Sequence, residues 1–302
     1  MAMNFFFPKN QTADYIEDNI DFGEMYQQVV EDFNRQEDYN SDFIEGGSES
    51  DRYRNIPARL KYQPVMPNRK YINASLIDLG SNIPKSILSQ APMESTIDDF
   101  YEMCIANKVT DIVMLCNIFE KMKIKTCIYF PQKLNSTICT EGFTVTCLGF
   151  ENHKFGEHRL LGYVRNNKDS KDPAKSEGYV VSHYWFRSWP DFGVSDLETT
   201  SSFLEYIFEC FNPTNRLPII HCSAGVGRSG TLALAAIMIH FHIALGETLN
   251  ERLFRTVFYR IRERRYSAVQ TTEQLLFAYK LCKYTIRQKK SLVSLLNPEA
   301  ET

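Results

Sequence analysis

The sequence predicts an α/β domain in which helices flank a highly twisted mixed sheet. Residues 217–220, LPII, have the pattern of a short buried strand and lead directly into a glycine-containing loop. Residues 229–245 are apolar nearly all round, which is typical of a central, buried helix. Between residues 143 and 186, three runs rich in β-branched and aromatic residues predict antiparallel strands. These three observations together indicate one domain over residues 15–290.

The remaining elements follow from local patterns. Residues 11–40 alternate acidic and apolar residues at helical spacing and predict one or two amphipathic helices. Residues 94–108 predict a helix with acidic residues in its first turn and Ser95 as its N-cap. The other expected elements are strands at 71–77, 110–116, 143–150, 158–164 and 178–186, a solvated hairpin loop at 166–178, helices at 253–265 and 271–288, and tails at 1–14 and 291–302.

Composition narrows the class of protein. The chain has 302 residues, of which 43% are hydrophobic, enough for a large core. A net charge of −3 gives no general attraction to nucleic acid. Eight cysteines form no C-x-x-C pair and no metal-ligand cluster, which predicts separate thiols, a reducing compartment such as the cytoplasm, and neither metal nor cofactor. No signal-peptide core or membrane span is predicted.

The most informative stretch is HCSAGVGRSG, residues 221–230. Its glycines can take backbone angles closed to other residues, so successive N–H groups can converge on an anion. The order strand, loop, helix aims the positive end of a helix at whatever the loop holds. The stretch therefore predicts a site for a phosphate dianion, framed by Cys222 and Arg228 and lined by Ser223, Ala224, Gly225, Val226 and Gly227.

The same electrostatic field acts on the cysteine. A thiol at a helix N-terminus and beside a cation has a lowered pKa and is a thiolate at neutral pH. Arg228 offers a planar fork to two phosphate oxygens and stabilises the charge that spreads over them during transfer. The reaction implied is phosphoryl transfer to the sulfur of Cys222, whereas the alternative interpretation is a glycine-containing turn beside a buried cysteine.

This stretch resembles the signature of the protein tyrosine phosphatase family, HCSAGxGRSG, and further motifs agree with it. The resemblance implies the cysteine-based phosphatase fold and hydrolysis of phosphotyrosine in proteins through a cysteinyl-phosphate intermediate. SWPDFGV, residues 188–194, resembles the moving general-acid loop of the family, in which Asp191 protonates the leaving oxygen and Trp189 anchors the loop. Ser229 resembles the hydroxyl that stabilises the departing thiolate, and His221 the residue that orients the nucleophile loop.

Two more segments carry the resemblance. QTTEQ, residues 270–274, resembles the glutamine loop, in which Gln270 and Gln274 place the hydrolytic water. DRYRN, residues 51–55, resembles the phosphotyrosine-recognition loop, in which Tyr53 walls a cleft too deep for phosphoserine. Asn55 stands where many members have aspartate. Its amide oxygen can still accept a hydrogen bond from the substrate's backbone N–H, but that bond lacks the negative charge of a carboxylate.

Supporting matches and departures complete the comparison. Glu120 resembles the glutamate that pairs with the arginine, and Lys125 the lysine that approaches the acid loop. Ala91, Tyr101 and Phe130 depart from the family at packing positions, which bears on stability or loop closure more than on chemistry.

Three functions stay open at this point. An active phosphatase acting on tyrosine-phosphorylated proteins is favoured because the cysteine, the arginine and the acid are all present. A phosphotyrosine-binding pseudophosphatase with little turnover is the alternative. A dual-specificity or lipid phosphatase is disfavoured by Tyr53 and by the absence of lysines within the phosphate loop.

Overall fold

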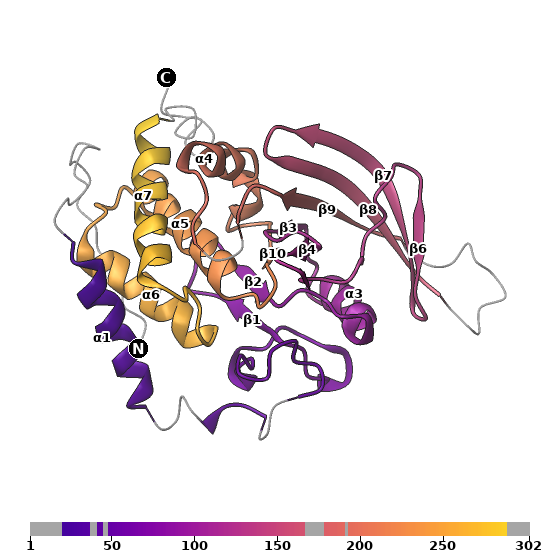
Figure 1. Cartoon of the computed structure of the whole chain (residues 1–302), viewed down its shortest axis with the longest axis horizontal. Helices are drawn as coiled ribbons and strands as arrows, with labels where there is room; N and C mark the ends of the chain where they lie inside the picture. The colour runs from indigo at the N-terminus through magenta and orange to yellow at the C-terminus, as the bar shows by residue number, and fades with distance from the viewer. Residues whose placement is uncertain (1–19, 37–40, 45–47, 167–177, 191–192, 289–302) are drawn as a thin grey trace.

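A computed structural model describes residues 20–36, 41–44, 48–166, 178–190 and 193–288 of the chain. Its centre is a mixed sheet of eight strands, which Figure 1 shows beside a group of helices. Along the sheet the strands are β1 (Ala74–Ile77), β2 (Ser86–Ser89), β10 (Pro218–His221), β3 (Asp111–Met114), β9 (Tyr179–Phe186), β8 (Gly156–Arg165), β7 (Phe143–His153) and β6 (Thr137–Cys139). Both the predicted α/β class and the mixed sheet are confirmed.

The central strands are parallel and the outer ones antiparallel. β10 runs parallel to β2 and β3, with Ile220 opposite Leu88 on one side and Val113 on the other. All residues of β2, β3 and β10 are buried, as expected for short parallel strands covered on both faces. β7 to β9 form the predicted antiparallel strands, and β6, which was not predicted, pairs with β7 at the edge. β7 alternates buried and more exposed residues over Phe143–Cys147. The parallel centre places the carboxyl end of β10 inside the molecule.

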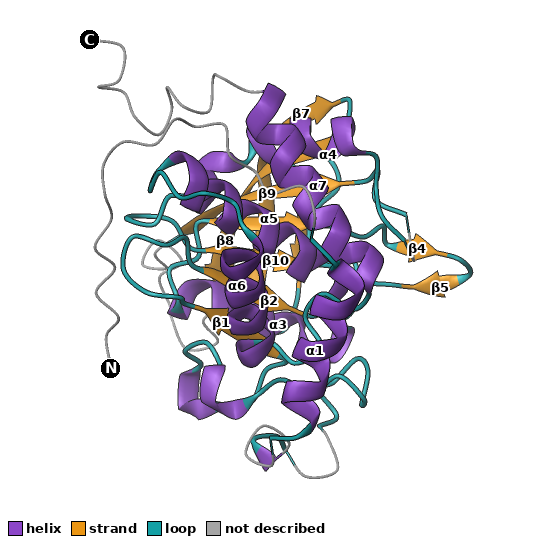
Figure 2. Cartoon of the chain, turned by 90° about the vertical axis from the view of Figure 1, so that its left-hand side faces the viewer, coloured by secondary structure: helices purple, strands orange, loops and turns teal. Residues whose placement is uncertain are grey.

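The helix after β10 forms the second layer of the core. α5 (Gly227–Ile243) is buried continuously from its first residue to His240, which confirms the predicted central helix. It packs against α7 (Thr272–Gln288) and α6 (Glu251–Arg264), and α7 in turn packs against a short helix that the sequence analysis did not anticipate, α4 (Leu197–Tyr206). Figure 2 shows this helical layer in front of the sheet.

The N-terminal part of the domain contributes one amphipathic helix among the described residues. α1 (Phe22–Asn34) begins after Asp21, whose carboxylate accepts the N–H of Glu24 at 2.9 Å as an N-cap. Its buried Phe22 contacts Phe254 of α6 and Tyr279 of α7, with ring centroids 5.7 and 5.0 Å apart. The predicted tails, residues 11–19 and 37–40 of the predicted helical region and most of the 166–178 loop lie outside the described residues.

One predicted detail is wrong. Ser95 is not the N-cap of α3 (Ile97–Ala106), because a 3₁₀ turn over Glu94–Thr96 precedes that helix and includes Ser95. The hydroxyl of Thr96 accepts the N–H of Met93 at 3.0 Å instead. Thr96 is the N-cap residue of α3, but its hydroxyl closes the 3₁₀ turn and makes no side-chain capping bond to α3.

Candidate active site

The phosphate loop connects the end of β10 to the start of α5. Cys222 directly follows β10, and Gly227 is the first residue of α5. Gly225 has φ +69°, and a Cβ atom there would lie 2.0 Å from the carbonyl oxygen of Ser89, so this position requires glycine. At Gly227 a Cβ atom would lie 2.6 Å from Oε1 of Gln270. Gly225 thus allows a left-handed backbone conformation, and Gly227 allows the glutamine loop to approach the phosphate loop closely.

A buried arginine that the sequence analysis did not select fixes the direction of the loop's peptide groups. Arg265 donates to the carbonyl oxygens of Ala224 at 2.9 Å and Gly225 at 3.1 Å. In a trans peptide the C=O and the following N–H point in opposite directions. Carbonyls held outward by Arg265 therefore turn the N–H groups of Gly225 and Val226 toward the concave side of the loop.

The nucleophile is ionised more easily than an ordinary thiol. Burial raises the pKa of Cys222, but the positive charge of Arg228, the hydroxyl and N–H of Ser229 and the N–H of Gly225 lower it, and the net shift is downward. Six other cysteines have a pKa raised by burial: Cys104, Cys116, Cys127, Cys147, Cys210 and Cys282. Cys222 differs from them because it faces a cation and hydrogen-bond donors at a helix start.

The arginine of the loop is held rigidly. Both terminal nitrogens of Arg228 donate to the carboxylate of Glu120, at 2.8 and 2.7 Å, and Nη1 also donates to the carbonyl of Leu115 at 2.8 Å. Glu120 is itself fixed by the N–H of Asn117 at 2.7 Å. It ends β4 (Phe119–Glu120), which pairs with β5 (Lys123–Ile124) in a separate hairpin. Bidentate pairing fixes the plane of the guanidinium beside Cys222.

His221 supports the loop from below as a neutral ring. Burial lowers the pKa of His221 to about 4. Its Nδ1 lies 3.1 Å from the carbonyl of Cys222, which can only accept, so Nδ1 carries the proton. Its Nε2 then accepts the hydroxyl of Tyr129 at 2.6 Å. This chain of buried hydrogen bonds fixes the backbone of Cys222.

The recognition loop is tied to the phosphate loop through Ser223. The Ser223 hydroxyl donates to the carbonyl of Lys125 at 3.0 Å, so Tyr53, 2.9 Å away, donates its own hydroxyl to Ser223. Asp51 holds the start of the recognition loop by accepting from Tyr71 and Asn73 at 2.7 and 2.6 Å. Tyr53 is therefore half-buried with a fixed ring, and Asn55 lies exposed further along the loop.

The glutamine loop lies over the start of α5. Oε1 of Gln274 accepts the N–H of Gln270 at 2.8 Å, and both side-chain amides approach Gly227. The N–H of Val269 donates to the carbonyl of Val226 at 3.0 Å. The structure thus brings both predicted glutamines next to the phosphate loop.

The acid loop is described only at its two ends. Trp189 is buried and packs edge-on against Phe277 of α7, with centroids 5.4 Å apart. The hydroxyl of Ser195 donates to the carbonyl of Ser188 at 3.1 Å and joins the two ends. Asp191, the predicted acid, lies outside the described residues. Lys125 is buried beside the phosphate loop.

The three departures from the family pattern leave the site intact. Ala91 contacts the site through its backbone. Its N–H donates to the carbonyl of Ser223 at 3.0 Å, and its carbonyl accepts from the guanidinium of Arg52 at 3.2 Å. The hydroxyl of Tyr101 donates to the carbonyl of Tyr129, next to the His221 network. The ring of Phe130 lies tilted against that of His183, with centroids 4.4 Å apart, and needs no polar partner.

A buried thiol of lowered pKa and a clamped arginine, on a loop that turns its N–H groups inward, define the class of cysteine-dependent phosphatases. A model of the protein-tyrosine phosphatase family matches residues 48–284. The chain belongs to the protein tyrosine phosphatase family, which confirms the resemblance found in the sequence.

Individual relatives agree with this assignment. The chain is 32% identical over 238 residues to tyrosine-protein phosphatase non-receptor type 2 from Homo sapiens, a match that covers 76% of the chain and 54% of that protein. It is 31% identical over 272 residues to tyrosine-protein phosphatase non-receptor type 9 from Homo sapiens, covering 82% and 43%. To receptor-type tyrosine-protein phosphatase alpha from Homo sapiens it is 30% identical over 247 residues, covering 78% and 29%. The chain spans about half the length, or less, of these curated relatives.

Proposed function

We propose that this chain hydrolyses phosphotyrosine in proteins through a cysteinyl-phosphate intermediate. The observation that carries the proposal is the pairing of Cys222, whose thiol has a lowered pKa, with Arg228, whose guanidinium is locked by Glu120. A thiolate supplies the nucleophile, and the arginine with the loop N–H groups binds the equatorial phosphate oxygens. The names of the relatives support phosphotyrosine as the substrate class.

In the first step the sulfur of Cys222 attacks phosphorus, and the bond from phosphorus to the tyrosine oxygen breaks. The departing phenoxide takes a proton, which we assign to Asp191 on the basis of the SWPDFGV motif. Arg228 stays bound to the transferred group because Glu120 holds its plane in place throughout. The products of this step are a tyrosine side chain and a phosphorylated cysteine.

In the second step water attacks the same phosphorus, and the bond to sulfur breaks. We assign the orientation of that water to Gln270 and Gln274, whose position against Gly227 supports the role, and the acceptance of its proton to Asp191. Ser229 supplies the hydrogen bond that stabilises the departing thiolate. Inorganic phosphate leaves, and Cys222 returns to its starting state.

Tyr53 supports phosphotyrosine over shorter phosphorylated side chains. Its hydroxyl is anchored on Ser223 inside the phosphate loop, which supports the assignment of its ring as the wall of the cleft. A flat aromatic substrate can stack on this wall while its phosphate reaches the loop. The same wall argues against a dual-specificity pocket, and the complete set of polar groups argues against a pseudophosphatase.

The finer parts of the proposal concern the whole protein. We place the catalytic domain at residues 15–290, a region that contains the matched segment. Eight unpaired cysteines and the non-receptor names of two relatives support action in the cytoplasm on tyrosine-phosphorylated proteins, without nucleic acid. In the described part of the chain, no helix has the length and apolar character needed to span a membrane.

Turnover of an aryl phosphate in the presence of a chelator tests the proposal. The wild-type chain is expected to release phosphate from p-nitrophenyl phosphate and from a phosphotyrosine peptide, and Cys222→Ser to release none. A requirement for a divalent cation, or activity that survives Cys222→Ser, would contradict the mechanism. Activity toward phosphoserine and phosphotyrosine peptides at equal efficiency would contradict the substrate class.

A further inference from the structure

The β4–β5 hairpin presents two different faces. Its paired residues are Phe119 with Ile124 and Glu120 with Lys123. Paired residues share a face, and successive residues of a strand point to opposite faces. Because Glu120 points inward to Arg228, Phe119 and Ile124 lie on the outward face. Figure 2 shows the hairpin projecting from the rest of the domain.

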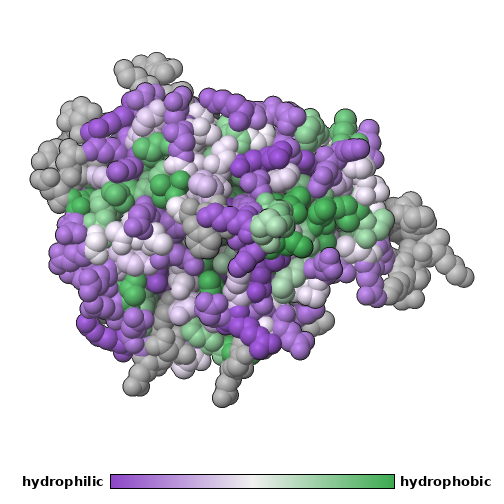
Figure 3. Space-filling view, viewed as in Figure 1, coloured by the Kyte–Doolittle hydropathy of each residue, from purple (hydrophilic) through white to green (hydrophobic). Residues whose placement is uncertain are grey.

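The outward face is apolar and uncovered. Phe119 is 57% exposed, Met122 86% and Ile124 67%, and we call these three residues the hairpin patch. In Figure 3, hydrophobic residues gather to the right of centre, over the position that β4 occupies in Figure 1. Large apolar side chains gathered at one exposed place indicate an interaction site.

The turn of the hairpin indicates that its side chains are used for contact. Lys121 and Met122 have φ values of 46° and 62°, the left-handed pair of a type I′ turn. Such a turn favours Asn-Gly, because long side chains are strained at positive φ. The chain carries lysine and methionine here instead. These residues make the turn less stable than Asn-Gly would, and the methionine places an apolar side chain at the tip of the hairpin.

The base of the hairpin belongs to the active site. Phe119 precedes Glu120, which binds Arg228, and Ile124 precedes Lys125, whose carbonyl accepts from Ser223. The N–H of Lys125 also donates to the carbonyl of Ile118 at 2.9 Å and closes the hairpin. An extended peptide covers about 3.3–3.6 Å per residue, so residues a few positions from a bound phosphotyrosine have the reach to contact the hairpin.

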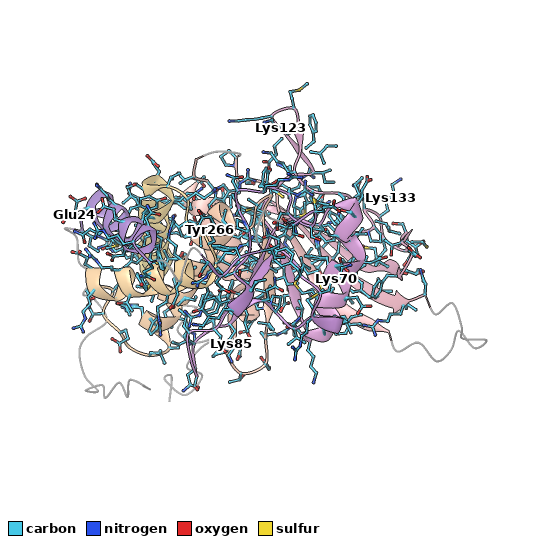
Figure 4. All side chains as sticks on the ribbon, turned by 90° about the horizontal axis from the view of Figure 1, so that it is seen from below. Glu24, Lys70, Lys85, Lys123, Lys133 and Tyr266 are labelled. Carbon is cyan, nitrogen blue, oxygen red and sulfur yellow. The ribbon has the colours of Figure 1, made fainter. Side chains whose placement is uncertain are left out.

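Charge completes the description of the partner. Residues 121–128, KMKIKTCI, contain three lysines and no acidic residue. Lys121 and Lys123 are exposed and precede and follow Met122 in the chain. Lys123 pairs with Glu120 and therefore lies at the rim of the apolar face, and Figure 4 shows it on the part of the hairpin that stands clear of the domain. The surface therefore complements a peptide in which apolar and acidic residues lie close together.

We infer that the hairpin patch binds apolar residues flanking the phosphotyrosine of a substrate protein, with acidic neighbours of those residues facing Lys121 and Lys123. This inference rests on the proposed function, because it assigns sequence specificity to the same site. The patch contributes to KM for peptides and leaves the chemical step to Cys222 and Arg228.

The test compares two phosphotyrosine peptides, one with leucine and glutamate flanks and one with serine and glycine flanks, together with p-nitrophenyl phosphate. The variant is Met122→Gly combined with Ile124→Thr; glycine accepts φ 62° without strain, so the hairpin keeps its turn. We expect kcat/KM for the leucine–glutamate peptide to fall roughly 5- to 30-fold through KM, with the other two substrates within about twofold of wild type. Val180→Thr, at an exposed apolar position of β9, is the matched control and should change none of the three.

Several results would overturn the inference. Equal losses on all three substrates would show that the hairpin acts on Arg228 rather than on the peptide, and unchanged ratios would show that the patch touches no substrate. Dimerisation of the wild type that Met122→Gly abolishes, with peptide kinetics unchanged, would assign the patch to a second copy of the chain. A wild-type protein without turnover would refute the proposed function but not the inference. The effect of the hairpin variant would then be measured as peptide dissociation constants, with both proteins carrying Cys222→Ser.

Discussion

The phosphate loop and the β4–β5 hairpin meet at the bond between Arg228 and Glu120, yet they are built in opposite ways. In the loop, Cys222 and Arg228 are buried and held by hydrogen bonds from the core. In the hairpin, large apolar side chains stand in solvent and the turn is strained. The difference fits the two tasks that we propose: a transferred phosphate, the same in every substrate, suits a fixed cradle, whereas variable flanking residues suit an open rim.

This comparison predicts that changes in the centre act on every substrate. Arg228→Lys should lower kcat about 10³-fold or more, because lysine lacks the planar fork and leaves the buried carboxylate of Glu120 with a single-point partner. Steady-state kinetics with p-nitrophenyl phosphate measures the loss. Arg216→Lys, at a half-exposed arginine paired with Asp111, is the control for charge-conserving change. A loss confined to peptides would place Arg228 at the rim instead.

Asp191→Asn should give the next largest effect, about 10²–10⁴-fold in turnover for substrates with poor leaving groups. The reason is that only a poor leaving group needs the proton at the moment of bond cleavage. A series of aryl phosphates of decreasing leaving-group pKa should show the loss shrinking. Equal losses across that series would show that Asp191 is not the proton donor.

The pH dependence of Cys222 reactivity tests the electrostatic environment of the phosphate loop. Burial raises the pKa of Cys222, but Arg228 and Ser229 lower it below that of a free thiol, near 8.5. Inactivation by iodoacetate should therefore have its midpoint below that pH, and Ser229→Ala should move the midpoint upward. The pKa of Cys222 is lower in the folded than in the unfolded protein, so ionisation of the thiol stabilises the fold at a pH above the unfolded-state pKa. This stabilisation is lost as the pH falls through the folded-state pKa.

The control for that experiment is Cys127→Ser, which removes a thiol whose pKa burial raises to about 11. It should leave the inactivation profile unchanged. Modification that maps by mass spectrometry to a cysteine other than Cys222 would contradict the electrostatic account of the loop.

The smallest effect is expected at the wall of the cleft. Tyr53→Ala should cost roughly 1 kcal/mol or more of aromatic contact, seen as a raised KM for phosphotyrosine peptides. Tyr53→Phe keeps the ring and removes only the hydrogen bond to Ser223, so it should lie between the alanine variant and wild type. Peptide kinetics for the three proteins give the order. A pocket in which Tyr53→Ala changes phosphoserine and phosphotyrosine turnover alike would refute the wall.

Much of the site could be predicted from the sequence because its chemistry is local. Residues 221–230 are contiguous, so the nucleophile, the glycines and the arginine could be assigned from spacing alone. The β-branched and aromatic residues of β7 and the apolar character of α5 likewise predicted their places in the sheet and the core. Family motifs then predicted Glu120, Tyr53, Gln270 and Gln274, and the structure brings all four to the phosphate loop.

Only the tertiary structure decided the contacts between residues that are far apart in the chain. Arg265 lies in RERR, residues 262–265, a run typical of a solvated helix face, yet it is fully buried under the phosphate loop. Its role depends on α6 ending beside Gly225, 40 residues earlier, which no local pattern reveals. β2 was missed because a four-residue strand has little pattern of its own and forms by pairing with β1 and β10. Sequence determines which groups can react and which segments are apolar, whereas packing decides which distant backbone and side-chain groups hold them in place.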